Sequence, residues 1–292
     1  MFQFNRDKME AFIQAVIADN LSLEAFDWFN TKINLPMEAG TLNNTFALIP
    51  RKVGKAVICL DKEQVEAIKA IRSGLSIEGW SVDRLCRVYL LMKLDSSDKD
   101  VYFRLIDNLF LAAEMSELVA LYSALPVLAY PGLWVKRCSE GIRSNIGLVL
   151  ESIMYNNPYP AENLDQAAWN QLVLKAFFTD KNVHLIYGLD ERANAELAYI
   201  LSDYAHERWA AFRSINPQLW RLTTKFLDVR LFDDIKKVMR EGDTVDQRAA
   251  ALAAYHSDYF PAKDFINSFP DLKNELENRS LTWDSLALAE RS

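Results

Sequence analysis

Three ionisable side chains follow one another on a stretch with helical periodicity, at spacings that would allow acid–base chemistry. His206 and Glu207 lie three and four residues after Asp203, so a helix over residues 190–213 would project all three to neighbouring positions. A histidine beside carboxylates can exchange protons with a bound substrate or contribute to a metal site. Solvated surface charge is the alternative, because carboxylates four residues apart repel each other by only about a few tenths of a kcal/mol.

Two polar residues fall on the other, apolar side of the same stretch. Asn194 and Arg208 share that side with leucine, tyrosine and tryptophan residues, so Arg208 must meet a carboxylate, backbone carbonyls or a cavity. Arg192 precedes Glu196 by four residues and can pair with it. We therefore predict ligand-binding roles for Arg192, Asn194 and Arg208, with a satisfied network between helices as the alternative.

A rigid turn precedes a second apolar helix. The prolines of the string NPYP, residues 157–160, favour extended backbone and predict a fixed entry into a helix over residues 163–178. Asn170 falls within the apolar side of that helix, so its amide needs partners in the turn or in the polar pair of the 190–213 helix. The ligand-binding candidates of this region are Asn157, Tyr159, Asn170 and Lys175.

The familiar signatures of cofactor and metal sites do not occur in the sequence. There is no glycine-rich nucleotide loop, no GxSxG, no HExxH and no paired CxxC. The histidines are His184, His206 and His256, so a multi-histidine metal site would need nearly all of them. We predict neither a cofactor nor a metal, and we favour a protein that is not an enzyme.

Composition excludes further classes of function. The net charge of −7 disfavours a nucleic-acid partner, which would require a basic surface. Three widely spaced cysteines form no disulfide framework and are expected as buried thiols in a reducing compartment. No apolar run approaches the roughly 18 residues of a membrane span, so we expect a cytoplasmic protein, with peripheral membrane association left open.

Helical periodicity dominates the chain and predicts an all-α fold. The expected helices include residues 98–112, 115–128, 131–155, 163–178, 190–213, 217–226, 229–240, 244–257 and 260–268. Short connections between them favour an irregular α-solenoid or helical-hairpin array of the HEAT or armadillo type, in a single domain over 1–292. Residues 43–60 are the exception and could form a small hairpin or an irregular strap.

Several strings in residues 80–225 resemble those of the EboA-like family of metabolite traffic proteins. They include Asn157-Pro158-Tyr159-Pro160, Ala168-Trp169-Asn170-Gln171, Gly188-Leu189-Asp190-Glu191-Arg192-Ala193-Asn194, Tyr204-Ala205-His206-Glu207-Arg208-Trp209 and Pro217-Gln218-Leu219-Trp220-Arg221. The resemblance implies a bacterial gene cluster that moves secondary-metabolite precursors out of the cytoplasm. It implies no catalytic residues.

We therefore expect a soluble, non-enzymatic protein of a secondary-metabolite processing and export pathway, which binds a small metabolite or pathway partner proteins. The first alternative is an enzyme that acts on such a metabolite through Asp203, His206 and Glu207. The second is a protein scaffold whose concave face holds another protein.

Overall fold

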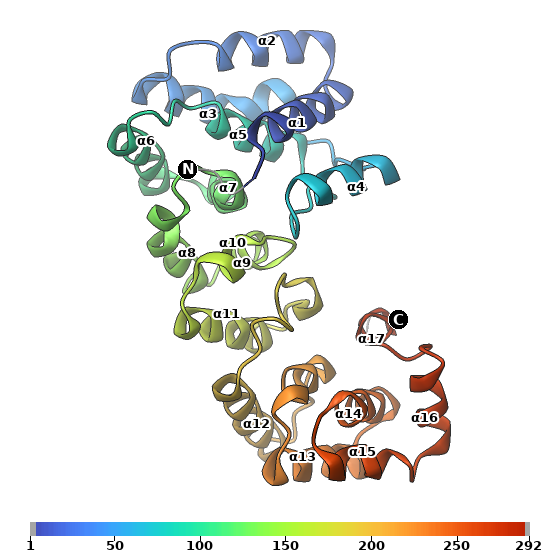
Figure 1. Cartoon of the computed structure of the whole chain (residues 1–292). Coiled ribbons are helices and arrows are strands. Elements are labelled where there is room, and N and C mark those ends of the chain that lie inside the picture. Colours follow the sequence, from blue (N-terminus) through green and yellow to red (C-terminus); the bar gives the residue numbers. More distant parts are fainter. Residues whose placement is uncertain (1–3, 290–292) are drawn as a thin grey trace. The chain divides into compact units, whose positions relative to one another are not determined.

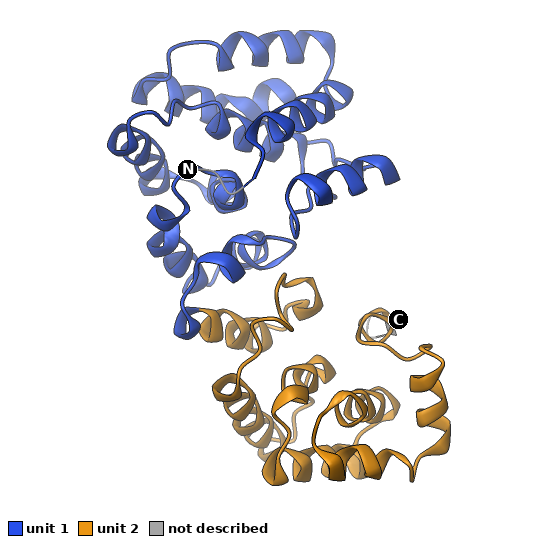
Figure 2. Cartoon of the chain, viewed as in Figure 1, with its two compact units in different colours: residues 1–168 blue, residues 169–292 orange. Residues whose placement is uncertain are grey.

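The computed structural model describes residues 4–289, and within them the chain forms helices and turns without a β-strand. An isolated bridge joins Val57 and Ser81. The prediction of an all-α helical array is confirmed. The chain divides into two compact units, unit 1 over Met1–Ala168 and unit 2 over Trp169–Ser292, which Figure 2 shows in different colours.

Unit 1 contains ten α-helices and two 3-10 turns within its described part (Figure 1). They are α1 (Arg6–Asn20), α2 (Leu23–Ile33), α3 (Ala39–Val53), α4 (Lys62–Ile71), α5 (Val82–Met92), α6 (Lys99–Ala112), α7 (Met115–Ala124), η1 (Leu125–Val127), η2 (Pro131–Trp134), α8 (Val135–Ile142), α9 (Gly147–Met154) and α10 (Tyr159–Asn163). α5 lies in the core and packs against α1, α3 and α7, so ten of its eleven residues are buried.

Residues 43–60, for which the sequence leaves a hairpin and a strap open, are helical over most of their length. The buried side chains of α3 recur with helical spacing at Leu42, Phe46, Ile49 and Val53. A hairpin is therefore wrong, because these branched and aromatic residues form one face of a helix instead of two strands. An irregular strap follows from Gly54, where the Val82 amide donates to Ala56 O at 2.8 Å.

A proline inside α3 leaves a carbonyl without its helical donor. Pro50 has no amide hydrogen, so it cannot donate to the carbonyl of Phe46, four residues earlier. Arg87 of α5 replaces that donor, since its Nε donates to Phe46 O at 3.0 Å. The buried guanidinium thus completes α3 as well as binding Asp83 on its own helix at 3.0 Å.

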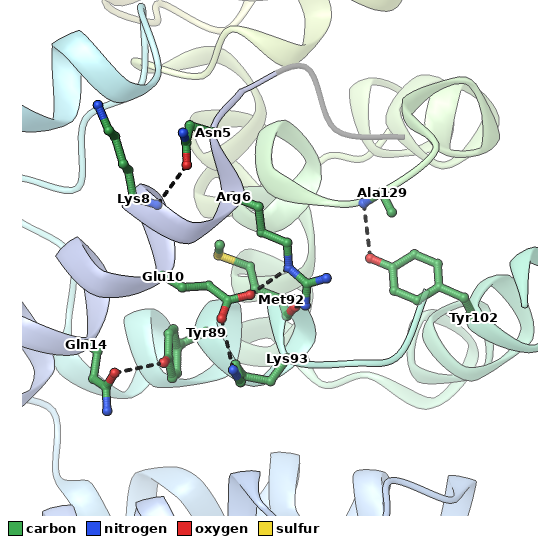
Figure 3. Close-up of polar contacts among 10 residues, drawn as sticks. All are labelled: Asn5, Arg6, Lys8, Glu10, Gln14, Tyr89, Met92, Lys93, Tyr102 and Ala129. Atoms are coloured by element: carbon green, nitrogen blue, oxygen red, sulfur yellow. Dashed lines mark hydrogen bonds and ion pairs between the residues drawn. The ribbon is translucent and has the colours of Figure 1, made fainter. Parts of the chain in front are cut away.

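The first turn of α1 is tied to the last turn of α5 by a polar cluster (Figure 3). Arg6 Nε and Lys93 Nζ donate to the two carboxylate oxygens of Glu10, at 2.6 Å and 2.9 Å. Arg6 also donates through Nη2 to Met92 O at 2.7 Å. Two cations therefore lie at the carboxyl end of α5, where the helix dipole favours positive charge.

The helix α11 (Gln166–Phe178) contains the boundary between the units, and the other elements of unit 2 follow it. They are η3 (Val183–Leu185), α12 (Ala195–Ala210), η4 (Pro217–Leu222), η5 (Thr224–Phe226), α13 (Val229–Glu241), α14 (Thr244–His256), α15 (Phe260–Ile266), α16 (Pro270–Glu277) and α17 (Trp283–Ala289). α14 is the centre of this unit, and Figure 1 shows α13, α15 and α16 around it. Its six consecutive buried residues from Ala249 to Ala254 include five alanines, which let neighbouring helices approach closely.

Some expected helices are shorter or divided in the structure. Residues 131–155, expected as one helix, form η2, α8 and α9, because Ser144 Oγ accepts a hydrogen bond from the Ile146 amide and starts a turn. Gly141 permits the resulting close contact, since a Cβ there would lie 2.5 Å from Ile153 Cδ1. Residues 217–226 form the 3-10 turns η4 and η5 instead of an α-helix.

The cysteines are free thiols in two different environments. Cys86 and Cys138 are buried, and burial raises the pKa of both thiols above the usual value. Cys59 is exposed, so the expectation of buried thiols is wrong at that position. In the part of the chain described here, no helix is both long and apolar enough to cross a membrane.

Candidate functional site

The polar side of α12 faces α13 and carries a histidine held by a buried carboxylate. His206 Nε2 lies 2.5 Å from Asp234 Oδ1, and Ser202 donates its hydroxyl hydrogen to Asp234 Oδ2 at 2.6 Å. Asp234 and Ser202 are buried, whereas 49% of the His206 side chain is exposed. An ionised carboxylate only accepts hydrogen bonds, so this contact fits a ring whose Nε2 is the donor. A histidine oriented in this way by a carboxylate is suited to acid–base chemistry.

The structure does not bring Asp203, His206 and Glu207 together around one substrate position. Asp203 forms an ion pair with Arg230 of α13. Glu207 is exposed, and its carboxylate has no ion pair or hydrogen bond within residues 4–289. Over the same residues, no group of three or more His, Cys, Asp or Glu side chains is placed to hold a metal ion. The neighbouring helix α13 thus supplies a cation for Asp203.

Sequence reasoning missed Asp234, the residue that holds the histidine. The signal was present, since Asp234 falls on the apolar side of α13 beside Leu231, Ile235 and Val238. A carboxylate in such a position needs a buried partner, and the nearest polar face is that of α12.

A pocket of about 220 Å³ lies in unit 2 beside this histidine, and we name it the Trp209 pocket. Its residues come from the end of α12, the following loop, η4, α13 and the start of α14: Trp209, Arg213, Ser214, Ile215, Trp220, Lys237, Val238, Glu241, Gly242 and Asp246. The Trp209 ring stacks on His206 at 5.4 Å and on the buried Trp220 at 5.9 Å between ring centres. The pocket therefore has a rigid aromatic wall.

Charges of both signs line the Trp209 pocket. Lys237 Nζ lies 4.3 Å from the centre of the Trp209 ring and 3.9 Å from a Glu241 carboxylate oxygen, so this cation has contacts inside the protein. Arg213 and Asp246 have no ion-pair partner among the described residues. Burial, and secondly the Asp243 carboxylate, raise the pKa of Asp246, whose backbone amide donates to Asp243 Oδ1 at 2.9 Å.

Asp246→Asn is expected to stabilise the folded protein near neutral pH. The pKa of Asp246 is raised on folding, so the folded state holds this proton more tightly and wild-type stability falls as the pH rises through the acidic range. Asparagine has nearly the same shape and carries no charge, so it removes that loss. Urea unfolding from about pH 4 to about pH 7 should show the advantage of the variant increasing with pH. A constant difference would contradict the assignment.

Two further pockets lack unpaired charges of this kind. One, of about 370 Å³, is lined by Arg248 and Glu275, which pair with each other at 3.2 Å. The other, of about 300 Å³ in unit 1, includes Lys93, Asp95 and Asp98. Lys93 is bound to Glu10, Asp98 caps α6, and Asp95 accepts hydrogen bonds from the amide and the hydroxyl of Ser97. These charged groups therefore have ion-pair or hydrogen-bond partners within the described residues.

The asparagines expected on apolar helix faces meet each other. Asn194 Nδ2 donates to Asn170 Oδ1 at 2.9 Å, and Asn170 Nδ2 donates to Asn194 Oδ1 at 3.4 Å. Asn194 also caps α12, because its Oδ1 accepts the Leu197 amide at 3.0 Å. Arg192 lies over the buried Trp169 ring at 5.0 Å. The structure thus places three candidates from the sequence in one cluster that fixes the start of α12.

Asn194→Ala is expected to lower the free energy of unfolding by about 1–2 kcal/mol, because it removes both the cap of α12 and the partner of Asn170. Asn194→Ser keeps a capping oxygen and should recover most of the loss. Thermal or urea unfolding of the two variants measures the difference. If the alanine and serine variants are equally stable, the cap contributes little.

The other predicted residues have contacts of a structural kind. Arg208 is half-buried, and its Nε donates to Ser214 O at 2.9 Å, so a backbone carbonyl is its partner. Lys175 is half-buried in the last turn of α11. Neither residue belongs to the lining of the Trp209 pocket.

The turn at residues 157–160 is closed by its own polar groups within unit 1. Asn157 Nδ2 donates to Ser152 O at 2.9 Å, and its Oδ1 accepts the Tyr159 amide at 3.0 Å. Tyr159 is fully buried and donates to Pro131 O at 2.6 Å, while burial raises the pKa of its hydroxyl. A short helix, α10, begins within this string at Tyr159, so the expected extended backbone is wrong for that residue. The longer helix α11 begins later, after Asp165 caps it through the Ala168 amide.

The chain matches the model of one protein family. The family model described as metabolite traffic protein EboA matches residues 9–224, which include α12 and η4 but end before α13 and α14. No curated protein and no solved structure matches the chain. The resemblance seen in residues 80–225 is confirmed and extends to the helices of the N-terminal region. The chain therefore belongs to the EboA family of metabolite traffic proteins.

Proposed function

We propose that this protein binds a small metabolite in the Trp209 pocket and passes it on unchanged. The observation that carries this proposal is that Arg213 and Asp246 line one pocket and have no ion-pair partner in the described chain. A polar ligand would satisfy such groups, while the Trp209 and Trp220 rings would contact its apolar part. Membership of a metabolite traffic family agrees with a binding role.

The pathway and the compartment that we propose are those that the family resemblance implies. The metabolite belongs to a bacterial secondary-metabolite pathway of processing and export, and the protein binds it in the cytoplasm without a cofactor. Pathway proteins deliver or accept the ligand. Of the residues expected from the sequence to bind it, Asn194 fixes the start of α12 and Arg208 the loop at its end, so both hold the helix that carries Trp209.

Ser214→Trp tests the site by filling it. Ser214 is exposed at the pocket, so the large side chain can enter without replacing a core residue. Native mass spectrometry of protein purified from its own cells should show a bound small molecule whose occupancy falls at least roughly tenfold in the variant. Ser280→Trp, which places the same side chain in the pocket of Arg248, is the matched control and should keep the ligand.

Two results of that experiment would contradict the proposal. A ligand retained equally by wild type and Ser214→Trp binds elsewhere. A stoichiometric protein that purifies with the chain, with no small molecule, indicates a scaffold for pathway proteins.

An enzyme acting on the same metabolite is the second candidate, and the pair of His206 with Asp234 favours it. The histidine ring stacks on Trp209, which lines the pocket, so an acid–base group lies one side chain away from the proposed ligand. Product formed by wild type but not by His206→Gln would establish this function over simple binding. Asp203→Asn is the matched control, because Asp203 pairs with Arg230 instead. Recovery of the metabolite unchanged from wild type contradicts the enzyme.

A further inference from the structure

We propose that the ligand of the Trp209 pocket is a zwitterion with an apolar body, whose anionic group binds Arg213 and whose cationic group binds Asp246. This inference rests on the proposed function of the pocket and adds the chemical class of the ligand. It depends on which charged groups in the pocket are already paired and which are not.

Arg213 is the cation available to an anionic group. It is exposed in the loop after α12, and its guanidinium has no ion pair within residues 4–289. The backbone of Arg213 is fixed, because its amide donates to Arg208 O at 2.9 Å. The other cation, Lys237, is engaged by the Trp209 ring and by Glu241. A carboxylate can therefore bind the planar fork of Arg213 without breaking an existing pair.

Asp246 is the anion available to a cationic group. It lies in the first turn of α14, half-buried and near the like-charged Asp243, and both circumstances raise the pKa of its carboxyl group. A ligand ammonium would offset both effects. Gly242 packs closely against Asp246, since a Cβ at residue 242 would lie 2.6 Å from the Asp246 Cβ atom.

Apolar side chains form part of the lining, and the volume of the pocket is small. Trp209, Trp220 and Val238 line the pocket, and its volume of about 220 Å³ lies below the roughly 300–1,000 Å³ common for drug-sized ligands. A ligand with only an anionic group would bind Arg213 and leave Asp246 less hydrated and without a partner. A ligand with only a cationic group would bind Asp246 and leave Arg213 without a partner. The pocket therefore disfavours ligands that carry a single charge of either sign.

The test compares probes that share one body and differ in charge. The probes are phenylalanine and leucine, each as the free amino acid, the amide, the N-acetyl acid and the N-acetyl amide, which are respectively zwitterionic, cationic, anionic and neutral. In calorimetric titrations, at least one free amino acid should bind roughly tenfold more tightly than its single-charge analogues.

Two variants assign each charge to its residue. Arg213→Gln should lower the affinity for the free amino acid to that for the amide, and Asp246→Asn should lower it to that for the N-acetyl acid. Arg104→Gln, an equivalent change at an exposed arginine of unit 1, should leave the affinity unchanged. A single-charge analogue that binds as tightly as the free amino acid overturns the inference.

The failure of this inference differs from the failure of the proposed function. If no probe binds, while Ser214→Trp still removes the retained metabolite, the zwitterion is wrong and the pocket remains the binding site. If Ser214→Trp leaves the retained metabolite in place, both are wrong.

Discussion

Replacing Arg87 with methionine is expected to lower the free energy of unfolding by about 3–5 kcal/mol, because it leaves a buried carboxylate without its counter-ion. Only 2% of the Arg87 side chain is exposed, and only 4% of that of Asp83. Asp83 Oδ1 already has no hydrogen-bond partner in the described chain, so the guanidinium is the main compensation for that charge. Urea unfolding followed by circular dichroism measures the loss.

An exposed ion pair of the same unit is the matched control for this prediction. Lys69 and Glu66 pair at 3.1 Å with 59% and 74% of their side chains exposed, so Lys69→Met should cost less than about 1 kcal/mol. A loss from Arg87→Met no larger than that of Lys69→Met would show that the buried pair is already hydrated.

The same site separates the roles of Arg87. Adding Asp83→Leu to Arg87→Met removes one orphaned charge, and the remaining loss of about 1–3 kcal/mol should then come from the unpaired carbonyl of Phe46 and from Glu117, whose carboxylate lies 3.7 Å from Arg87 Nη2. Adding Pro50→Ala restores an amide donor four residues after Phe46 and should recover the part of the loss that comes from that carbonyl. If Pro50→Ala recovers nothing in this background, the hydrogen bond from Arg87 to Phe46 does not support α3.

The sequence predicts the helices of unit 2 well where local signals agree. The expected ranges 229–240 and 244–257 differ by one residue at most at each end from α13 and α14, because the apolar spacing and the flanking caps indicate the same limits. α3 was missed because its branched residues resemble strands locally, and only burial against α5 shows that their spacing is helical.

The exact capping residues were harder to predict, because suitable side chains occur close together. Asp190 is a suitable N-cap residue for the helix expected over 190–213, but Asn194 caps α12 instead. Asp190 is instead bound by Arg221 of η4 at 2.6 Å and 2.7 Å. The ion pair with Arg221, a residue distant in the sequence, therefore engages Asp190. A single sequence does not reveal such a contact.

Only part of the candidate site follows from sequence spacing. The contact between Asn170 and Asn194 could be expected, since both are polar groups on apolar helix faces and must find partners. The Trp209 pocket could not, because its lining comes from four helices or turns and the loop between two of them. Periodicity describes one helix at a time and does not show which ends of different helices meet.

Trp220→Ala is expected to lower the free energy of unfolding by about 3–5 kcal/mol and to abolish ligand binding in the Trp209 pocket. Only 1% of Trp220 is exposed, and its ring supports Trp209 from behind at 5.9 Å. Removing it leaves a cavity and lets the Trp209 ring move from the position that contacts the ligand. Urea unfolding measures the first effect, and titration of the retained metabolite under folded conditions measures the second.

Trp209→Ala provides the comparison that separates packing from recognition. Trp209 is half-buried, so its loss should cost about 1–2 kcal/mol, clearly less than that of Trp220, while ligand binding falls equally. Trp220→Phe keeps an aromatic support and should recover part of both properties. If Trp209→Ala binds the metabolite as tightly as wild type, the aromatic wall is a part of the core and the ligand lies elsewhere in unit 2. Equal stability losses for the two tryptophans would instead show that Trp209 is as important to the core as Trp220.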